Sequence, residues 1–309
     1  MRLALASPSR CTMITAMNAT VTKFKALKVS ALVAMAALSS MASPAQALDQ
    51  KVMDALVPHK ALYEIKMVSK DSGSQILNIS GQMFYEWRPE CEAWVTDHRF
   101  NLMYEYADSA PMKITSDFST YETFDGKEFN FSSRRKRNGE LYQELRGIGE
   151  FPVAAEESEV STGEAVYSMP DGLIFDLDQG VLFPMAHTVK VLEYAEAGKR
   201  FFHATIFDGS DEEGPVEINT FIGDRVNAMA RLDDTNKNMD TTLINTPARK
   251  VRMAFFPLAE PNADAEYEMD VVFHDNGIIS DMLVEYRDFS VTQKLVALEK
   301  LPENDCTDR

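Results

Sequence analysis

Residues 61–87 read ALYEIKMVSKDSGSQILNISGQMFYEW, and this stretch decides the fold class. Apolar and charged side chains alternate from Tyr63 to Met67, and a second alternating run from Ile76 to Trp87 follows an Asp-Ser-Gly turn at residues 71–73. A period of two residues is typical of a β-strand with one buried face. The stretch therefore predicts two strands that lie side by side and antiparallel.

The same period dominates the chain after residue 87. Alternating runs cover residues 94–106 and 112–124, and two-residue hairpin signals stand at Asp125-Gly126, Asn138-Gly139 and Asn276-Gly277. We count at least ten strands from these patterns. The sequence predicts an all-β fold built from many antiparallel strands.

Helical patterns are short and few. Residues 49–57 place apolar side chains on one face and end before Pro58, which predicts a short helix. A second helix is expected over residues 188–197, with Thr188 as its N-cap and Gly198 after its end. We therefore expect one or two short helices beside the strands.

The first 47 residues have the features of an export signal. Lys23, Lys25 and Lys28 precede an apolar run at residues 29–42, and Ala45-Gln46-Ala47 forms a small-x-small cleavage site. We predict that residues 1–47, which include an over-extended gene start, are removed and that residues 48–309 form a single β domain in the periplasm. A retained membrane anchor is the weaker alternative, because the apolar run is shorter than the roughly 20 residues that span a bilayer.

The charge of the chain narrows the classes of partner. The full chain carries a formal charge of −17, and loss of the five basic residues of the export segment moves this value to about −22. Nucleic-acid binding requires basic side chains that neutralise phosphates. The composition therefore argues against a nucleic-acid partner.

Cys91 and Cys306 are the two cysteines of the predicted mature chain. Disulfides persist in an exported protein, and we expect these two residues to form one. The bond would return the C-terminus to the second or third strand, which favours one closed or spiralled β domain. Loop-closure entropy for the roughly 215 enclosed residues gives about 5 kcal/mol as an upper estimate of its stabilisation.

Two histidines beside prolines are candidate site residues. His59 follows Pro58, and His187 follows Phe183-Pro184. Each could line the mouth of a pocket, or could bind backbone at a junction between a loop and a helix. The sequence has no Gly-x-Ser-x-Gly elbow and no His spacing typical of a metal site. We expect no enzyme activity, no metal and no cofactor.

Two charged segments have both a functional and a structural interpretation. Residues 208–214 are rich in carboxylates, which could bind calcium weakly, although an exposed hairpin tip is favoured. Arg134, Arg135, Lys136 and Arg137 form a basic run at a predicted hairpin tip. This run could contact an anionic partner or could be a solvated surface.

The aromatic residues of the strands leave two interpretations open. They could fill the core, or a curved sheet that does not close could leave some of them lining a groove for an acyl chain or an extended peptide. An exposed edge of such a sheet would also favour the addition of a peptide strand.

Several stretches, taken together and in order, resemble one known family, the cell-envelope-integrity protein EipB family. The resemblance covers nearly all of the mature chain and lies in residues 56–63, 81–91, 116–127, 183–187, 197–210 and 276–306. One departure stands beside Cys91, where Ala93 replaces the family's usual glycine before Trp94.

The resemblance implies a periplasmic spiral or broken β-barrel with an internal cavity, in which the family's two cysteines match Cys91 and Cys306 and are joined. It also implies a role in envelope integrity beside a repeat-containing periplasmic lipoprotein, without enzyme activity. We expect a protein or peptide to be the ligand, and a soluble carrier of lipid or lipoprotein acyl chains is the alternative. The candidate cavity residues are His59, Trp94, Phe183, His187 and Phe207.

Overall fold

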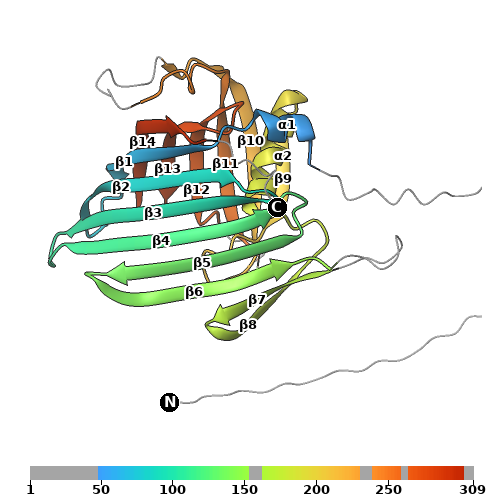
Figure 1. Ribbon diagram of the computed structural model, residues 1–309. Helices are drawn as coiled ribbons and strands as arrows, with labels where there is room; N and C mark the ends of the chain where they lie inside the picture. The colour runs from blue at the N-terminus through green and yellow to red at the C-terminus, as the bar shows by residue number, and fades with distance from the viewer. Residues whose placement is uncertain (1–47, 153–161, 230–238, 259–263, 303–309) are drawn as a thin grey trace, which may run out of the picture. The chain divides into compact units, whose positions relative to one another are not determined.

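The computed structural model describes residues 48–152, 162–229, 239–258 and 264–302. The predicted export segment and Cys306 lie outside these residues, so neither expectation is settled by the fold. Within them, fourteen antiparallel strands form one continuous sheet, accompanied by two helices (Figure 1). The predicted all-β class is confirmed.

The sheet is made of two meanders that meet at its middle. β1 pairs with β14, so the first and last strands of the chain are neighbours, and the order is β8-β7-β6-β5-β4-β3-β2-β1-β14-β13-β12-β11-β10-β9. The strands of the first meander are β1 (His59–Lys70), β2 (Ile76–Pro89), β3 (Ala93–Tyr106), β4 (Met112–Thr123), β5 (Glu128–Arg137), β6 (Glu140–Glu150), β7 (Gly163–Met169) and β8 (Asp171–Leu177). Those of the second are β9 (Phe201–Ile206), β10 (Val216–Val226), β11 (Ala248–Pro257), β12 (Tyr267–His274), β13 (Ile279–Tyr286) and β14 (Phe289–Lys300).

The sheet curls so that its two meanders share a core. In Figure 1, β2–β6 run across the view whereas β10 and β11 stand nearly upright. The largest core cluster joins Tyr63 and Met83 of the first meander to Val251 and Val271 of the second. The inner faces of the two meanders are therefore turned toward each other, which gives the expected spiral.

Local sequence determines the hairpins. The three predicted turns connect β4 to β5, β5 to β6 and β12 to β13. Asn138 and Gly139 both have positive φ angles, 52° and 89°, as a tight hairpin with a right-handed strand twist requires. These turns are confirmed at the predicted residues.

Both predicted helices exist, but the start of the second was predicted wrongly. α1 (Gln50–Ala55) is capped by the Asp49 side chain, which accepts a hydrogen bond from Lys51 N. α2 (Pro184–Glu196) begins four residues before Thr188, whose hydroxyl instead donates to Pro184 O. None of the helices in the described ranges is long and apolar enough to cross a membrane.

The acidic segment connects the antiparallel strands β9 and β10, as the predicted hairpin requires, but only Glu212 and Glu213 of it are exposed, so the prediction of a wholly exposed tip is wrong. Tyr167 OH donates to Asp211 O and an Arg135 Nη donates to Ser210 O, both at 2.7 Å. Gly209 lies so close to Phe131 that a Cβ atom would meet the ring at 2.5 Å. The segment therefore fills the inner side of β5–β8.

Candidate functional site

A cavity of about 310 Å³ lies between the inner face of the sheet and α2. Strands of both meanders line it, together with the first turn of α2 and the turn after β12. Its lining residues include no Asp, Glu, Lys or Arg, although a quarter of the chain is charged. They are Leu56, His59, Tyr63, Met83, Tyr85, Trp87, Thr96, His98, Phe100, Thr120, Pro184, Met185, Thr188, Met269, Phe273, Asn276, Gly277, Ile279, Met282 and Gln293.

An aromatic wall at the start of β1 forms one side of the cavity. The His59 ring lies 5.5 Å from Tyr85 and 6.0 Å from Trp87, between ring centroids. Its Nδ1 donates to Val57 O at 2.7 Å, which leaves Nε2 as an acceptor in the neutral ring. Burial lowers the pKa of His59, against the opposing effect of that hydrogen bond. The wall is therefore uncharged.

The polar groups on β3 and β4 are neutral as well. The Thr96 and Thr120 hydroxyls are 2.5 Å apart and bind each other. His98 packs edge-on against Tyr85 with 4.7 Å between centroids, and burial lowers the pKa of His98 to about 4. A neutral imidazole and paired hydroxyls offer hydrogen bonds without charge.

Tyr63 and Gln293 line the cavity from the neighbouring strands β1 and β14. Tyr63 OH donates to Ile279 O at 2.7 Å, and burial raises the pKa of Tyr63. Gln293 Oε1 has no hydrogen-bond partner in the part of the chain that the structure describes. A buried acceptor without a partner is costly, so a donor on a bound molecule would stabilise this wall.

Glu122 of β4 holds the helix that closes the cavity. Its two carboxylate oxygens accept hydrogen bonds from Met185 N and Ala186 N, both at 2.7 Å. These amides belong to the first turn of α2, where Phe183 at the N-cap provides no side-chain bond. Burial raises the pKa of Glu122 to about 8, while the two hydrogen bonds oppose the rise.

Known proteins resemble this chain in both sequence and fold. The sequence model of the EipB-like family matches residues 50–302. The chain belongs to the EipB-like family. A relative in the same family, the cell envelope integrity protein EipB of Brucella abortus (strain 2308), is 30% identical over 249 residues, which cover 79% of this chain and 84% of that protein.

A solved structure shares the fold. The crystal structure of a beta-barrel-like protein of domain of unknown function DUF1849 from Brucella abortus superposes with a TM-score of 0.70 at 27% identity. The superposition covers 80% of this chain and 99% of that protein. The name of the 30% identical relative supports a role in envelope integrity, and the barrel-like description of the crystal structure agrees with the curled sheet.

The structure places one of the five candidate cavity residues in the lining. His59 lines the cavity, and Trp94 stands behind the lining, stacked on Trp87 at 5.3 Å. Phe183 and Phe207 belong to the separate aromatic cluster inside β5–β8. His187 is buried against Phe202 at 5.6 Å between centroids. For these four residues a ligand contact remains a prediction that the cavity geometry does not support.

Three side chains of the basic run, residues 134–137, contact other residues of the protein. Arg134 pairs with Glu144 at 3.2 Å, Arg135 donates to Gln143 and to Ser210 O, and the Arg137 guanidinium lies 5.0 Å from the centre of the Tyr142 ring. A contact with an anionic partner stays a prediction for this run.

The acidic turn shows internal bonding. Ser210 N and Glu213 N donate to the Asp208 and Asp211 carboxylates, both at 2.8 Å. In the described ranges, no group of three or more His, Cys, Asp and Glu side chains is arranged to hold a metal ion.

Sequence reasoning missed Glu122, His98 and Gln293. The strand pattern carries a signal for the first, because Glu122 has the same inward parity as Phe118 and Thr120, and a carboxylate on an inward face is unusual. His98 and Gln293 have no such signal. Only the curl of the sheet brings β3 and β14 to one cavity.

Proposed function

We propose that this protein supports the integrity of the cell envelope from the periplasm, as a non-enzymatic binding protein whose cavity seats an uncharged, apolar part of an envelope protein or peptide. The absence of charged side chains from the described cavity lining is the observation that carries the proposal. Burying an unpaired charge costs several kcal/mol, so such a lining favours a neutral ligand group. The aromatic and methionine side chains supply the apolar contacts.

The polar atoms of the lining set the orientation of the bound group. His59 Nε2 and Gln293 Oε1 can accept hydrogen bonds, and these two residues stand on different strands. A peptide segment with an apolar side chain offers backbone N–H donors beside its apolar group. We propose an envelope lipoprotein, one with a repeat-containing periplasmic region, as the partner, and a disulfide between Cys91 and Cys306 as the bond that secures the fold.

A carrier of lipid or lipoprotein acyl chains is the second candidate. The apolar lining favours it as well. The volume of about 310 Å³ lies near the lower end of the roughly 300–1,000 Å³ of ligand pockets, which leaves room for one chain end. Extraction of the protein purified from the periplasm, followed by mass spectrometry, tests this alternative: acyl chains at one mole per mole of protein would favour the carrier over the proposal.

Site-specific photo-crosslinking in the periplasm tests the proposed function. Benzoylphenylalanine would replace Phe100 in the cavity lining or, as a matched aromatic control, the exposed Phe221 of β10. We expect an envelope protein to be attached from position 100 and not from position 221. Adducts of the same protein from both positions, or no protein adduct from position 100, would contradict the proposal.

A further inference from the structure

A row of apolar side chains is exposed on the outer face of β6, β7 and β8. Ile148 is directly opposite Val166, and Val166 is directly opposite Ile174. These side chains are 41%, 42% and 52% exposed. Three neighbouring apolar side chains on three adjacent strands are therefore exposed to solvent. Isolated exposed apolar residues are ordinary, but an ordered row of them indicates a contact surface.

A row of four carboxylates runs beside the apolar row. Glu128 is opposite Glu150, Glu150 is opposite Glu164, and Glu164 is opposite Asp176. Three of its members, Glu150, Glu164 and Asp176, lie two residues along their strands from Ile148, Val166 and Ile174, or about 6.6 Å away. Like charges directly opposite each other destabilise a sheet. The protein therefore bears an electrostatic cost on this face.

The described part of the chain offers these four carboxylates no ion-pair partner. Glu128 accepts a hydrogen bond from the neutral Asn130 amide, and no Lys or Arg of the described ranges stands within ion-pair distance of the row. Lys127, the nearest basic residue along the chain, pairs with Asp125 at 3.9 Å. The connection between β6 and β7 contributes three glutamates and no basic residue to the sequence.

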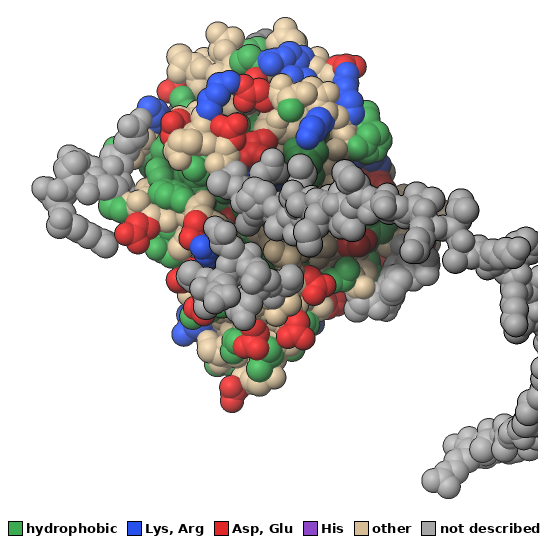
Figure 2. Space-filling model, turned by 90° about the vertical axis from the view of Figure 1, so that its right-hand side faces the viewer, with side chains coloured by type: hydrophobic (Ala, Val, Ile, Leu, Met, Phe, Trp, Pro, Cys, Tyr) green, Lys and Arg blue, Asp and Glu red, His purple; other side chains and the backbone are tan. Residues whose placement is uncertain are grey.

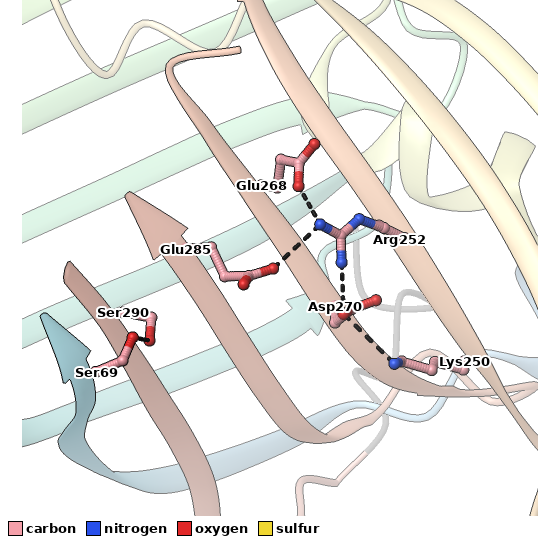
Figure 3. A network of polar contacts seen from close by, with 7 residues as sticks. All are labelled: Ser69, Lys250, Arg252, Glu268, Asp270, Glu285 and Ser290. Carbon is pink, nitrogen blue, oxygen red and sulfur yellow. Dashed lines mark hydrogen bonds and ion pairs between the residues drawn. The ribbon is translucent and has the colours of Figure 1, made fainter. Parts of the chain in front are cut away.

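In the other half of the sheet, facing carboxylates are paired with basic side chains. Glu268 and Glu285 are also directly opposite each other, on β12 and β13. Arg252 donates to both and to Asp270, and Lys250 pairs with Asp270 at 3.4 Å (Figure 3). This protein thus neutralises one set of facing carboxylates internally and leaves the other set open.

The open set borders a groove. Glu128, Glu150, Glu164, Ile148 and Val166 all line a surface groove of about 630 Å³ on β5–β7. Figure 2 looks at the side of the molecule on the right of Figure 1, and on that side acidic and apolar side chains are frequent in the lower part, whereas several basic side chains lie at the top. The face therefore combines concavity, apolar surface and uncompensated negative charge.

We propose that the outer face of β5–β8 is a docking surface for a basic amphipathic helix of a partner protein. Charge complementarity selects the occupant, because Lys or Arg side chains would neutralise the carboxylate row while an adjoining apolar stripe covers Ile148, Val166 and Ile174. The surface goes beyond the proposed function, since the cavity is lined by other strands, β1–β4 and β12–β14.

The spacing of the two rows fits a helix that lies across the strands. Neighbouring strands are about 4.8 Å apart, close to the 5.4 Å rise of one helical turn. Four strands span about 14 Å, which matches roughly ten helical residues. Residues three or four apart lie on one face of such a helix. A stripe of Leu can therefore cover the apolar row while a neighbouring stripe of Lys pairs with the carboxylate row.

Binding of a synthetic peptide tests the proposal. The probe is a fluorescent 14-residue peptide of Leu and Lys in which helical spacing places each residue type on its own stripe, and its partner is the protein from residue 48 to residue 309. The test variant combines Glu150→Gln and Glu164→Gln. The matched control combines Glu105→Gln on β3 and Glu140→Gln at the other end of β6 from Glu150, which remove two exposed carboxylates outside the row. A Val166→Thr variant tests the apolar row without a change of charge.

We expect the Glu150→Gln/Glu164→Gln variant to bind about tenfold more weakly, since each exposed ion pair contributes up to about a factor of five, and the control to stay within twofold. Val166→Thr should also weaken binding, and a peptide of the same composition in scrambled order should bind less tightly than the probe. Equal loss in the test and control variants, or equal binding of the scrambled peptide, would show only attraction to a negatively charged protein and overturn the proposal. A change in tryptophan emission would place the peptide at the cavity instead and would also overturn it.

Discussion

Glu122 shows how a single side chain can determine the geometry of the cavity. Its carboxylate holds Met185 N and Ala186 N, and Met185 itself lines the cavity. Burial raises the pKa of Glu122 to about 8 from an ordinary value near 4.5. A raised carboxyl pKa means that the folded protein binds this proton more tightly than the unfolded chain does. The protonated form therefore stabilises the fold.

Replacement of this carboxyl should change the pH dependence of stability. The Glu122 contribution is fully present below about pH 4.5 and is lost as the pH rises toward 8, at no more than about 1.4 kcal/mol per pH unit. In Glu122→Gln, the free energy of unfolding should therefore fall less between pH 5 and pH 8 than it does in the wild type. Urea unfolding at each pH measures the difference, and parallel curves for the two proteins would contradict the account.

The elements differ in how far the sequence predicts them. The hairpins at Gly126, Gly139 and Gly277 could be predicted, because each turn depends on a positive φ angle that its own glycine supplies. The start of α2 could not be predicted, since its cap is Glu122, 63 residues away along the chain. The packing of the segment after β9 was also missed, because the rings that cover it come from β5 and β8.

Two glycine substitutions separate turn conformation from packing. Gly139→Ala places a side chain at a φ of 89° with nothing within 4 Å, and should cost about 1 kcal/mol. Gly209→Ala has a similar backbone cost, with a φ of 64°, and also drives a methyl group into the Phe131 ring, which should add about 1–3 kcal/mol. Chemical denaturation measures both variants. A Gly209→Ala protein that is as stable as Gly139→Ala would show that the segment does not pack on β5.

At the scale of the whole molecule, the pairing of β1 with β14 joins the two ends of the predicted mature chain. His59 is opposite Lys300 at one end of this pair, and Lys70 is opposite Phe289 at the other. The alternating pattern of residues 61–87 predicted strands but not this neighbour, because pairing between strands more than 200 residues apart in the chain depends on the complete sheet. The cysteine positions alone indicated that the C-terminus returns to the early strands.

Removal of the proposed disulfide should destabilise this arrangement. Cys91→Ser or Cys306→Ser should lower the melting temperature in oxidising buffer, with a loss of up to about 5 kcal/mol for a loop of roughly 215 residues. Reductant should bring the wild type down to the level of the variants. An unchanged melting temperature in reductant would show that the two cysteines do not form a stabilising bond.

The central claim is that the cavity binds an uncharged apolar group, and the chain carries its own reporter. Its two tryptophans are Trp87 in the lining and Trp94 stacked on it, so tryptophan emission reports on the cavity wall. The direct test is a fluorescence titration of residues 48–309 with decanol and with decanoate at pH 7. We predict a saturable change in emission with decanol and at least about tenfold weaker binding of decanoate, whose carboxylate has no partner in the lining. Equal or tighter binding of decanoate, or no change with decanol, would contradict the account.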